Sequence, residues 1–536
     1  MSENRETNLR RAPILATMDL GHDAYYRAVA TRDARFDGRF FTGVTTTGIY
    51  CRPVCPARTP KRENMVFYPT AAAAQEAGFR PCLRCRPETS PDLGAWRGTS
   101  NTVSRALVLI ESGVLDQGDV EALAARLGLG ERQLRRLFRQ HLGASPVAVA
   151  QTRRVLLAKQ LIHETHLSMT EVALASGFGS VRRFNETFQQ LYDRSPIALR
   201  RARQTPASAA GTVTLKLPYK PPYDWDAILA FLAPRAIPGV EAVEDGVYAR
   251  TIVIGNAKGA FTARPTEDDR ISVTVHFPKL EALPAIIARV RRLFDLAADP
   301  LAIGEHLCRD VHLAPLVAAR PGLRVPGAWD GFEVGVRAIL GQQITVSAAI
   351  RIAGKIAAQY GEPLDEPVPG FPDLTRVFPS AKALAEADLS ALPMPRARSA
   401  SLSALAAAVA ADPLLLGPRA SLEEAVTTLR RLPGIGEWTA QYIAMRELRE
   451  PDAFPAADIG LMRAMADEAG IRPSAAALTV RAESWRPWRA YAAIHLWIAE
   501  SERLLADKSG AKRVQVRTKS RKTPTKEANH ADRGAT

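Results

Sequence analysis

The sequence predicts a multidomain, mainly α-helical protein with two smaller α+β units, and three observations lead to this fold class. The chain has 536 residues, more than one hydrophobic core usually supports, so several domains are expected. Helical periodicity dominates from Thr102 to about Arg203 and again from Gly327 to about Ala506. Between them, strand-like runs such as Val247 to Ile254 alternate with helical runs such as Pro284 to Phe294.

Small, polar stretches at Ser90 to Asn101 and at Arg203 to Val213 are typical of linkers and divide the chain into units. The tail is rich in Lys, Arg, Thr and Ala, has almost nothing to bury, and is therefore expected to be disordered. In order, the predicted units are a small α+β four-cysteine domain (15–92), an all-α double helix-turn-helix domain (100–203), an α+β sheet domain (213–325), an all-α helix-hairpin-helix domain (326–506) and the basic tail (507–536).

The charge balance favours a polyanionic partner. Lys and Arg total 71 against 56 Asp and Glu, a net charge of +15, and neutralising phosphates releases counterions. The first residues include acids and lack the apolar core of an export signal, and no run has the length of a membrane span. We therefore expect a cytoplasmic monomer without membrane contact.

Four of the five cysteines form two close pairs. They stand as Cys51-x3-Cys55 and Cys82-x2-Cys85, with 26 residues between the pairs, a spacing typical of a tetrahedral Zn²⁺ site with two thiolates from each turn. Four cysteine ligands leave no position for water, which favours a purely structural ion. Alternatively, one zinc thiolate acts as a nucleophile, because a coordinated thiol is deprotonated at neutral pH. The fifth, Cys308, is expected to be a buried thiol.

The surroundings of these cysteines resemble a known family. TTGIYCRPVCPART, RENMVFY and GFRPCLRC, within roughly residues 20 to 90, are similar to the N-terminal domain of the Ada adaptive-response family. The resemblance implies that Cys51 irreversibly accepts a methyl group from a methylphosphotriester in DNA, while the other three cysteines only bind zinc. Methylating one of four thiolates removes one of about two negative charges on the centre, which should strengthen DNA binding.

Two segments of the second unit have the rhythm of helix-turn-helix motifs. Their turns fall at Gly128 to Gly130 and at Gly177 to Gly179, and each is followed by a basic amphipathic helix. Such a helix suits a major groove, although the same pattern also fits a solvated charged face. The tandem arrangement resembles the AraC-type regulator domain, which implies promoter DNA and RNA polymerase as partners. The arginines expected to face DNA are Arg132, Arg135, Arg136, Arg182 and Arg183.

The stretch from Ser421 to Leu461 is the most informative part of the C-terminal half. Ser421 and Glu424 have the pattern of a capping box, and Leu432-Pro433-Gly434-Ile435-Gly436 separates two expected helices, the second starting near Glu437. The backbone N–H groups around Gly434 and Gly436 would cradle a phosphate of double-stranded DNA. With a Pro-containing loop and Asp458 about twenty residues further on, the segment resembles the HhH-GPD glycosylase superfamily.

Asp458 is the candidate catalytic carboxylate. Cleavage of an N-glycosidic bond develops positive charge on the sugar, which a fixed carboxylate stabilises while it assists the attacking water. Asp458 is also placed to cap the helix from Ile459, and the two roles are compatible. Asp452 competes with it, but its place before the Pro-rich turn favours a structural role. Trp438 stands where strand-nicking relatives carry a Schiff-base lysine, which implies a monofunctional, water-using enzyme.

The aromatic residues bear on the substrate class. Trp438 and Tyr442 share one helix face, and Trp497 lies in the later stretch YAAIHLWIAE. Packing in the core is the default interpretation of such residues. An aromatic cleft would instead select bases that alkylation at N3 or N7 has made cationic, by stacking and cation–π attraction after base flipping.

Roughly residues 213 to 505 resemble the DNA-3-methyladenine glycosylase II family, through KPPYDWDAILAFLAPRAIPGVE, EVGVRAILGQQITV and WRPWRAYAAIHLW. The resemblance implies that Phe231 joins the three aromatic residues above in the base pocket and that Gln343 is a wedge filling the gap left by the flipped base. A further implication is a monovalent cation held by the hairpin carbonyls of Arg430, Leu432 and Gly434.

Joined in one chain, these features predict DNA alkylation repair: a glycosylase for purines of the 3-methyladenine and 7-methylguanine type, fused to a methylation-activated transcription regulator. Two alternatives stay open. One is a regulator whose glycosylase half only binds DNA, against which the intact Asp458, the aromatic set and the hairpin count. The other is a glycosylase for oxidised or mispaired bases, which the cation-suited aromatic residues disfavour.

Overall fold

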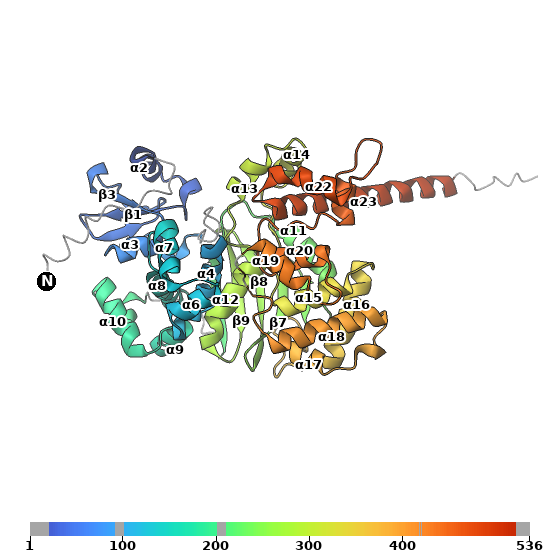
Figure 1. Ribbon diagram of the computed structural model, residues 1–536. Coiled ribbons are helices and arrows are strands. Elements are labelled where there is room, and N and C mark those ends of the chain that lie inside the picture. Colours follow the sequence, from blue (N-terminus) through green and yellow to red (C-terminus); the bar gives the residue numbers. More distant parts are fainter. Residues whose placement is uncertain (1–20, 92–100, 201–210, 418, 420, 521–536) are drawn as a thin grey trace, which may run out of the picture.

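The computed structural model describes residues 21–91, 101–200, 211–417, 419 and 421–520, with side chains described up to residue 505. The N-terminal half, on the left of Figure 1, packs against the sheet domain in the centre, and the helix-hairpin-helix domain covers the right. Helices predominate and the strands form two small sheets, so the predicted fold class is confirmed.

The first unit is a four-stranded sheet with helices beside it. The sheet order is β3-β1-β2-β4, antiparallel except for the parallel pair β2–β4. In that pair Tyr50 lies opposite Pro81, so the next residues along each strand, Cys51 and Cys82, are brought side by side. The elements are α2 (His22–Ala30), β1 (Phe41–Val44), β2 (Ile49–Cys51), β3 (Met65–Tyr68), α3 (Ala71–Glu76) and β4 (Arg80–Pro81), with 3-10 turns at Ala34–Phe36, Arg62–Asn64 and Pro87–Thr89.

The second unit is all helical and contains the two predicted helix-turn-helix motifs. Polar side chains begin several helices: Asp119, Ser145, Ser168 and Ser180 each accept a backbone N–H of the first turn. The helices are α4 (Asn101–Glu111), α5 (Val114–Gln117), α6 (Val120–Arg126), α7 (Glu131–Leu142), α8 (Pro146–Glu164), α9 (Met169–Ala175) and α10 (Val181–Tyr192), followed by the 3-10 turn Pro196–Leu199.

The third unit is a five-stranded antiparallel sheet with the order β5-β9-β8-β7-β6. Its strands are β5 (Thr212–Pro218), β6 (Glu241–Glu244), β7 (Val247–Ile254), β8 (Ala257–Thr266) and β9 (Arg270–His276), and its helices are α11 (Trp225–Leu232) and α12 (Leu283–Leu293), with 3-10 turns at Ala233–Arg235 and Leu280–Ala282. The predicted strand at Val247 to Ile254 and the predicted helix at Pro284 to Phe294 are thus both present.

The fourth unit contains the hairpin and the longest helices of the C-terminal half. α13 (Pro300–Leu307) and α14 (Leu313–Ala319) lie in the segment predicted to belong to the third unit, but they pack into the hydrophobic cluster of the fourth. The remaining helices are α15 (Gly331–Leu340), α16 (Val346–Tyr360), α17 (Ala381–Ala385), α18 (Arg396–Ala411), α19 (Leu422–Leu429), α20 (Glu437–Arg446), α21 (Ile459–Ala464), α22 (Ala475–Ala482) and α23 (Arg489–Ser520), with 3-10 turns at Leu389–Ala391 and Glu483–Trp485.

Two expectations differ from the structure. The backbone of residues 507–520, predicted as disordered, continues α23 to Ser520 (Figure 1), because extending an existing helix requires no new nucleus; residues 521–536 lie outside the described part. Cys308 is exposed rather than buried. It caps the C-terminus of α13, whose buried side is formed by Ile303 and Leu307.

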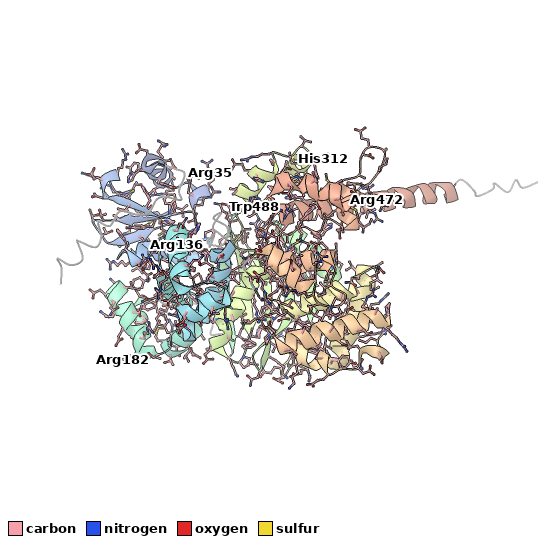
Figure 2. The ribbon with its side chains drawn as sticks, in the orientation of Figure 1. Arg35, Arg136, Arg182, His312, Arg472 and Trp488 are labelled. Carbon is pink, nitrogen blue, oxygen red and sulfur yellow. The ribbon has the colours of Figure 1, made fainter. Side chains whose placement is uncertain are left out.

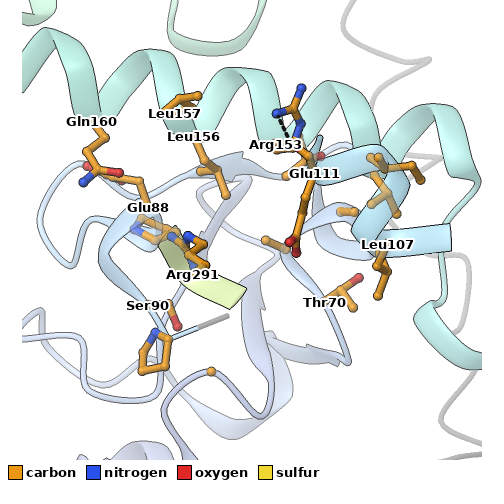
Figure 3. Close-up of a pocket in the computed structure, with 18 of the residues that line it drawn as sticks. Thr70, Glu88, Ser90, Leu107, Glu111, Arg153, Leu156, Leu157, Gln160 and Arg291 are labelled. Atoms are coloured by element: carbon orange, nitrogen blue, oxygen red, sulfur yellow. Dashed lines mark hydrogen bonds between the residues drawn. The ribbon is translucent and has the colours of Figure 1, made fainter. Parts of the chain in front are cut away.

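The units share their interiors. One hydrophobic cluster runs without interruption from α8, α9 and α10 into the five-stranded sheet. A small cavity of about 200 Å³ marks the junction of the first three units, lined among others by Thr70, Leu107, Leu156 and Arg291 (Figure 3). The N-terminal half, formed by the first two units, and the C-terminal half are therefore docked on one another.

Candidate active site and DNA-binding surfaces

The four paired cysteines converge on one point. Their sulfur atoms all lie within 4.8 Å of one another, and in a tetrahedral site with Zn–S bonds of 2.3 Å the sulfurs stand about 3.8 Å apart. The backbone N–H groups of Arg52 and Arg84 donate to the sulfurs of Cys85 and Cys82 at 3.3 and 3.4 Å. Donors aimed at sulfur favour thiolates, so Cys51, Cys55, Cys82 and Cys85 are arranged to hold one zinc ion.

Buried charges connect this site to the helix-turn-helix unit. Lys159 of α8 is fully buried, and its Nζ donates to the carbonyl of Cys82 (3.0 Å) and to Glu88 (2.9 Å). Within the first unit, Arg52 pairs with Asp37 and donates to the carbonyl of Cys85. The cysteine-bearing loop and α8 are therefore held together by a satisfied ionic network.

The predicted DNA-facing arginines lie on the exposed sides of α7 and α10. Arg132, Arg135 and Arg136 project from α7, whereas Leu134 and Phe138 of the same helix are buried. Arg182 and Arg183 are exposed on α10, opposite the buried Phe184 and Phe188. Figure 2 shows Arg136 and Arg182 on the side of the molecule that the N-terminal half forms.

The hairpin has the geometry that the glycines suggest. Gly434 has a φ of +78°, a conformation that favours glycine, and Gly436 is the N-cap residue of α20 with open space where a Cβ would stand. Ser421 caps α19 by accepting the N–H of Glu424. Sequence reasoning missed Gln342, whose Nε2 donates to the carbonyl of Gly434 (2.9 Å) and to Thr439 Oγ1 (3.1 Å) and so ties the loop after α15 to the hairpin.

Asp458 is held by four donors. Its Oδ1 accepts the backbone N–H groups of Gly460 (2.8 Å) and Leu461 (3.0 Å) and the indole N–H of Trp497 (2.8 Å). Its Oδ2 accepts the indole N–H of Trp438 at 2.9 Å. Asp458 therefore caps α21, as the local pattern predicts, and its carboxylate is fixed in one orientation.

Asp458 lies in the wall of a large cavity. This cavity of about 780 Å³ also contains Trp438, Tyr442, Trp497 and Phe231 in its lining. The rings of Trp438 and Tyr442 stack on each other with centroids 5.3 Å apart and an interplanar angle of 9°, and Trp497 lies 6.5 Å from Tyr442 at 60°. The structure thus brings all four aromatic residues and the candidate carboxylate to one site.

Two arginines of the cavity were not predicted. The guanidinium of Arg235 lies 3.9 Å from the ring centroid of Phe231, and that of Arg446 lies 4.8 Å from it. Arg446 also donates to the hydroxyl of Tyr442 at 2.6 Å. Burial alone would raise the pKa of Tyr442, but the two cations outweigh it and lower that pKa. Each arginine follows one of the rings by four residues, Arg235 after Phe231 and Arg446 after Tyr442, so this spacing was an available local signal. The contact of Arg446 with Phe231 comes only from the fold.

The other candidates lie apart from the cavity. Gln343, the expected wedge, is exposed between α15 and α16 with a φ of +57° and does not belong to the cavity lining, whereas the next residue, Ile344, does. Asp452 is paired with Arg486 and Arg489, and burial raises its pKa. Asp452 thus has the environment of a structural ion pair.

Four family models match successive parts of the chain. They are the metal binding domain of Ada at residues 24–88, a helix-turn-helix domain at 123–202, the AlkA N-terminal domain at 214–330 and the HhH-GPD superfamily base excision DNA repair protein at 336–490. Fold and site together define a helix-hairpin-helix DNA repair protein joined to an Ada-type metal-binding and DNA-binding module.

Some similar proteins match nearly the whole chain, and others match only one of its halves. The probable bifunctional transcriptional activator/DNA repair enzyme AlkA of Mycobacterium tuberculosis is 44% identical over 483 residues, which are 89% of this chain and 96% of that protein. The chain belongs to this family. DNA-3-methyladenine glycosylase 2 of Escherichia coli is 40% identical, over 53% of this chain and 96% of its own length. The bifunctional activator/repair enzyme Ada of E. coli is 36% identical, over 30% of this chain and 43% of its own length.

Within the part of the chain that the structure describes, no helix is long and apolar enough to cross a lipid bilayer.

Proposed function

We propose that the chain is a monofunctional DNA glycosylase that hydrolyses the N-glycosidic bond of alkylated purines, and that Asp458 is its catalytic carboxylate. One observation carries the proposal: in the wall of an aromatic cavity next to a DNA-binding hairpin, two indole N–H groups and two backbone N–H groups hold the Asp458 carboxylate in place. A carboxylate fixed by donors on both oxygens is preorganised for charge that develops on the sugar.

The chemistry follows from this placement. A purine methylated at N3 or N7 is cationic, so its bond to C1′ breaks with the electron pair going to the base. Water then adds to C1′, and its proton passes to solvent or to Asp458, while the carboxylate offsets the charge on the sugar. The chain has Trp438 where a Schiff-base lysine would stand in strand-nicking relatives, which supports hydrolysis by water.

The cavity favours selection of a cationic base through its indole rings. The guanidinium groups of Arg235 and Arg446 already lie against Phe231, so this ring has little negative potential left to attract a further cation. Trp438 and Trp497 are the rings at the Asp458 end of the cavity. We infer that stacking on these indoles is the main source of discrimination.

A second activity is supported by the four-cysteine site next to the helix-turn-helix unit. We propose that Cys51 takes a methyl group from a methylphosphotriester: its sulfur forms the S–CH₃ bond, the O–CH₃ bond breaks, and a phosphodiester is left. A bound zinc ion would keep the cysteine thiols deprotonated. Methylation of Cys51 would remove one negative charge from the centre and so strengthen the binding of the protein to DNA. The chain would then act as a promoter-binding activator with RNA polymerase as its partner.

The location of the protein, the residue that fills the gap in DNA and a bound cation are further parts of the proposal. We infer a cytoplasmic monomer, with Gln343 as the residue that enters the gap left by the base. The hairpin carbonyls would hold a monovalent cation; those of Leu432 and Gly434 each accept one hydrogen bond, from Ile435 N and Gln342 Nε2, and a carbonyl has a second lone pair for an ion.

One methylated duplex tests both activities. Wild-type chain should release free 3-methyladenine, and Asp458→Asn, which keeps the cap on α21, should slow release at least about a hundredfold. The peptide containing Cys51 should gain one methyl group by mass spectrometry in wild type and none in Cys51→Ala. Base release by neither wild type nor variant, with duplex binding intact, would leave only the regulator interpretation. Methyl transfer by Cys51→Ala would remove Cys51 from the second activity.

A further inference from the structure

The loop that carries Asp458 is held by three different units. It runs between the end of α20 at Arg446 and the start of α21 at Ile459. Asp452 pairs with Arg486 and Arg489 of the glycosylase domain. Arg449, with a φ of +57°, donates to Val325 O at 2.8 Å and pairs with Asp295, which follows α12.

The third anchor comes from the regulatory half, by which we mean the zinc-binding and helix-turn-helix units. Arg105 of α4, in the helix-turn-helix unit, pairs with Glu450 through its Nε (3.1 Å) and one terminal nitrogen. Both side chains are only 5% exposed. The two residues are 345 positions apart in the chain, so nothing in the local sequence indicates that they meet.

Burial determines how much Glu450 depends on its ion pair with Arg105. It raises the pKa of Glu450, and the Arg105 guanidinium partly counters that effect. Without Arg105 the carboxylate would be left unpaired inside the protein, a state that side chains avoid by moving or by taking up a proton. Glu450 N also donates to Ala444 O of α20, and Glu450 O accepts Ala453 N. A shift of Glu450 would therefore pull on the backbone that leads to Asp458.

We propose that Arg105 is a positioning residue for base excision: the regulatory half completes the glycosylase by holding the loop that presents Asp458. This inference rests on the proposed glycosylase function. It implies that base excision at the full rate requires both halves of the chain. A displacement of about 1 Å at a catalytic group slows a reaction by about a hundredfold, so a small shift of Asp458 would have a large effect.

The test uses the full chain and single-turnover release of 3-methyladenine from methylated duplex. Arg105→Met should lower the rate constant about 10- to 100-fold, with the Kd for the duplex unchanged. Arg105→Lys should recover part of the loss. The double variant Arg105→Met, Glu450→Met, which removes both charges at similar volume, should recover most of it, since paired apolar replacements of a buried ion pair are tolerated.

The control for contacts between the halves is Arg39→Met, whose partner Asp299 keeps Lys220 as a second cation. Arg39 forms another ion pair between the halves, with Asp299 at 2.6 Å, but neither residue contacts the loop, so base release should stay at the wild-type rate. An unchanged rate in Arg105→Met, or a double variant as slow as the single one, would overturn the inference while wild-type activity upholds the proposed function. A wild-type chain that releases no base would overturn both.

Discussion

At the scale of single residues, the site depends on the edges of aromatic side chains as much as on their faces. Trp438 and Trp497 each line the cavity and each donate an indole N–H to a different oxygen of Asp458. The sequence pattern suggests rings for stacking on a base, and the structure adds a second use of the same residues: they orient the carboxylate.

Trp438→Phe tests this use because it keeps a ring and removes the donor. A hydrogen bond to a charged group contributes about 1.5–3 kcal/mol, so we expect base release to slow about tenfold to a hundredfold, measured under single-turnover conditions. Trp485→Phe is the control, since Trp485 donates in the same way to Asp310 (2.7 Å), a residue outside the cavity lining. It should lower the melting temperature without changing the rate. Equal rates for both variants and wild type would show that the Trp438 N–H has no role in the reaction.

At the scale of elements, the hairpin between α19 and α20 combines a conformational requirement at one glycine with open space at the other. Gly434 has a positive φ, and a Cβ there would lie 2.0 Å from Ser401 Oγ, whereas a Cβ on Gly436 would meet nothing within 4 Å. The two glycines therefore have different environments, and we expect different effects when each is replaced.

The pair Gly434→Ala and Gly436→Ala separates these effects. Gly434→Ala should destabilise the domain by more than about 1–2 kcal/mol, because a left-handed conformation costs an L-residue that much and the added Cβ also displaces Ser401; the effect would be seen as a lower melting temperature. Gly436→Ala should keep the wild-type melting temperature and weaken binding to an undamaged duplex, because its methyl group occupies the space in front of the α20 N-terminus where a phosphate would bind. Wild-type affinity in Gly436→Ala would argue that DNA contacts the chain elsewhere.

At the scale of the whole molecule, the zinc-binding unit is part of the scaffold of its neighbour. Thr70 donates to the carbonyl of Leu142 at the end of α7, and Glu76 accepts from Arg139 and from Ser145 at the turn into α8. Lys159 of α8 contacts the carbonyl of Cys82. The two helix-turn-helix motifs thus rest partly on a unit whose folding depends on a metal.

Zinc removal should consequently loosen more than the metal site. Metal binding to a four-cysteine site contributes directly to folding, so chelation at neutral pH should increase amide hydrogen exchange in α3 and also in α8, while α20 keeps its protection. Exchange measured by mass spectrometry on zinc-loaded and chelated protein gives this comparison within one sample. If protection were lost in α3 alone, the regulatory helices would be independent of the zinc unit.

Much of the site was predictable because its signals are local. The spacing within the pairs Cys51/Cys55 and Cys82/Cys85, the glycines of the hairpin and the cap position of Asp458 depend on a few neighbouring residues, and each such pattern strongly favours one kind of local geometry. The packing of Phe231 with Arg235 is also local. Gln343 shows the limit: its loop position did not reveal that its side chain is exposed and outside the cavity lining, and its role as a wedge stays a prediction.

The sequence by itself determined the fold class, the zinc ligands, the tandem helix-turn-helix motifs and the hairpin with its carboxylate, because periodicity, spacing and turn chemistry are properties of short segments. Only the tertiary structure decided which distant groups meet: the indole donors on Asp458, Arg446 against Phe231, Lys159 under Cys82, and Arg105 on Glu450. The physical reason is that these contacts form only when whole units pack together. Patterns within a short segment do not show which segments will pack against each other.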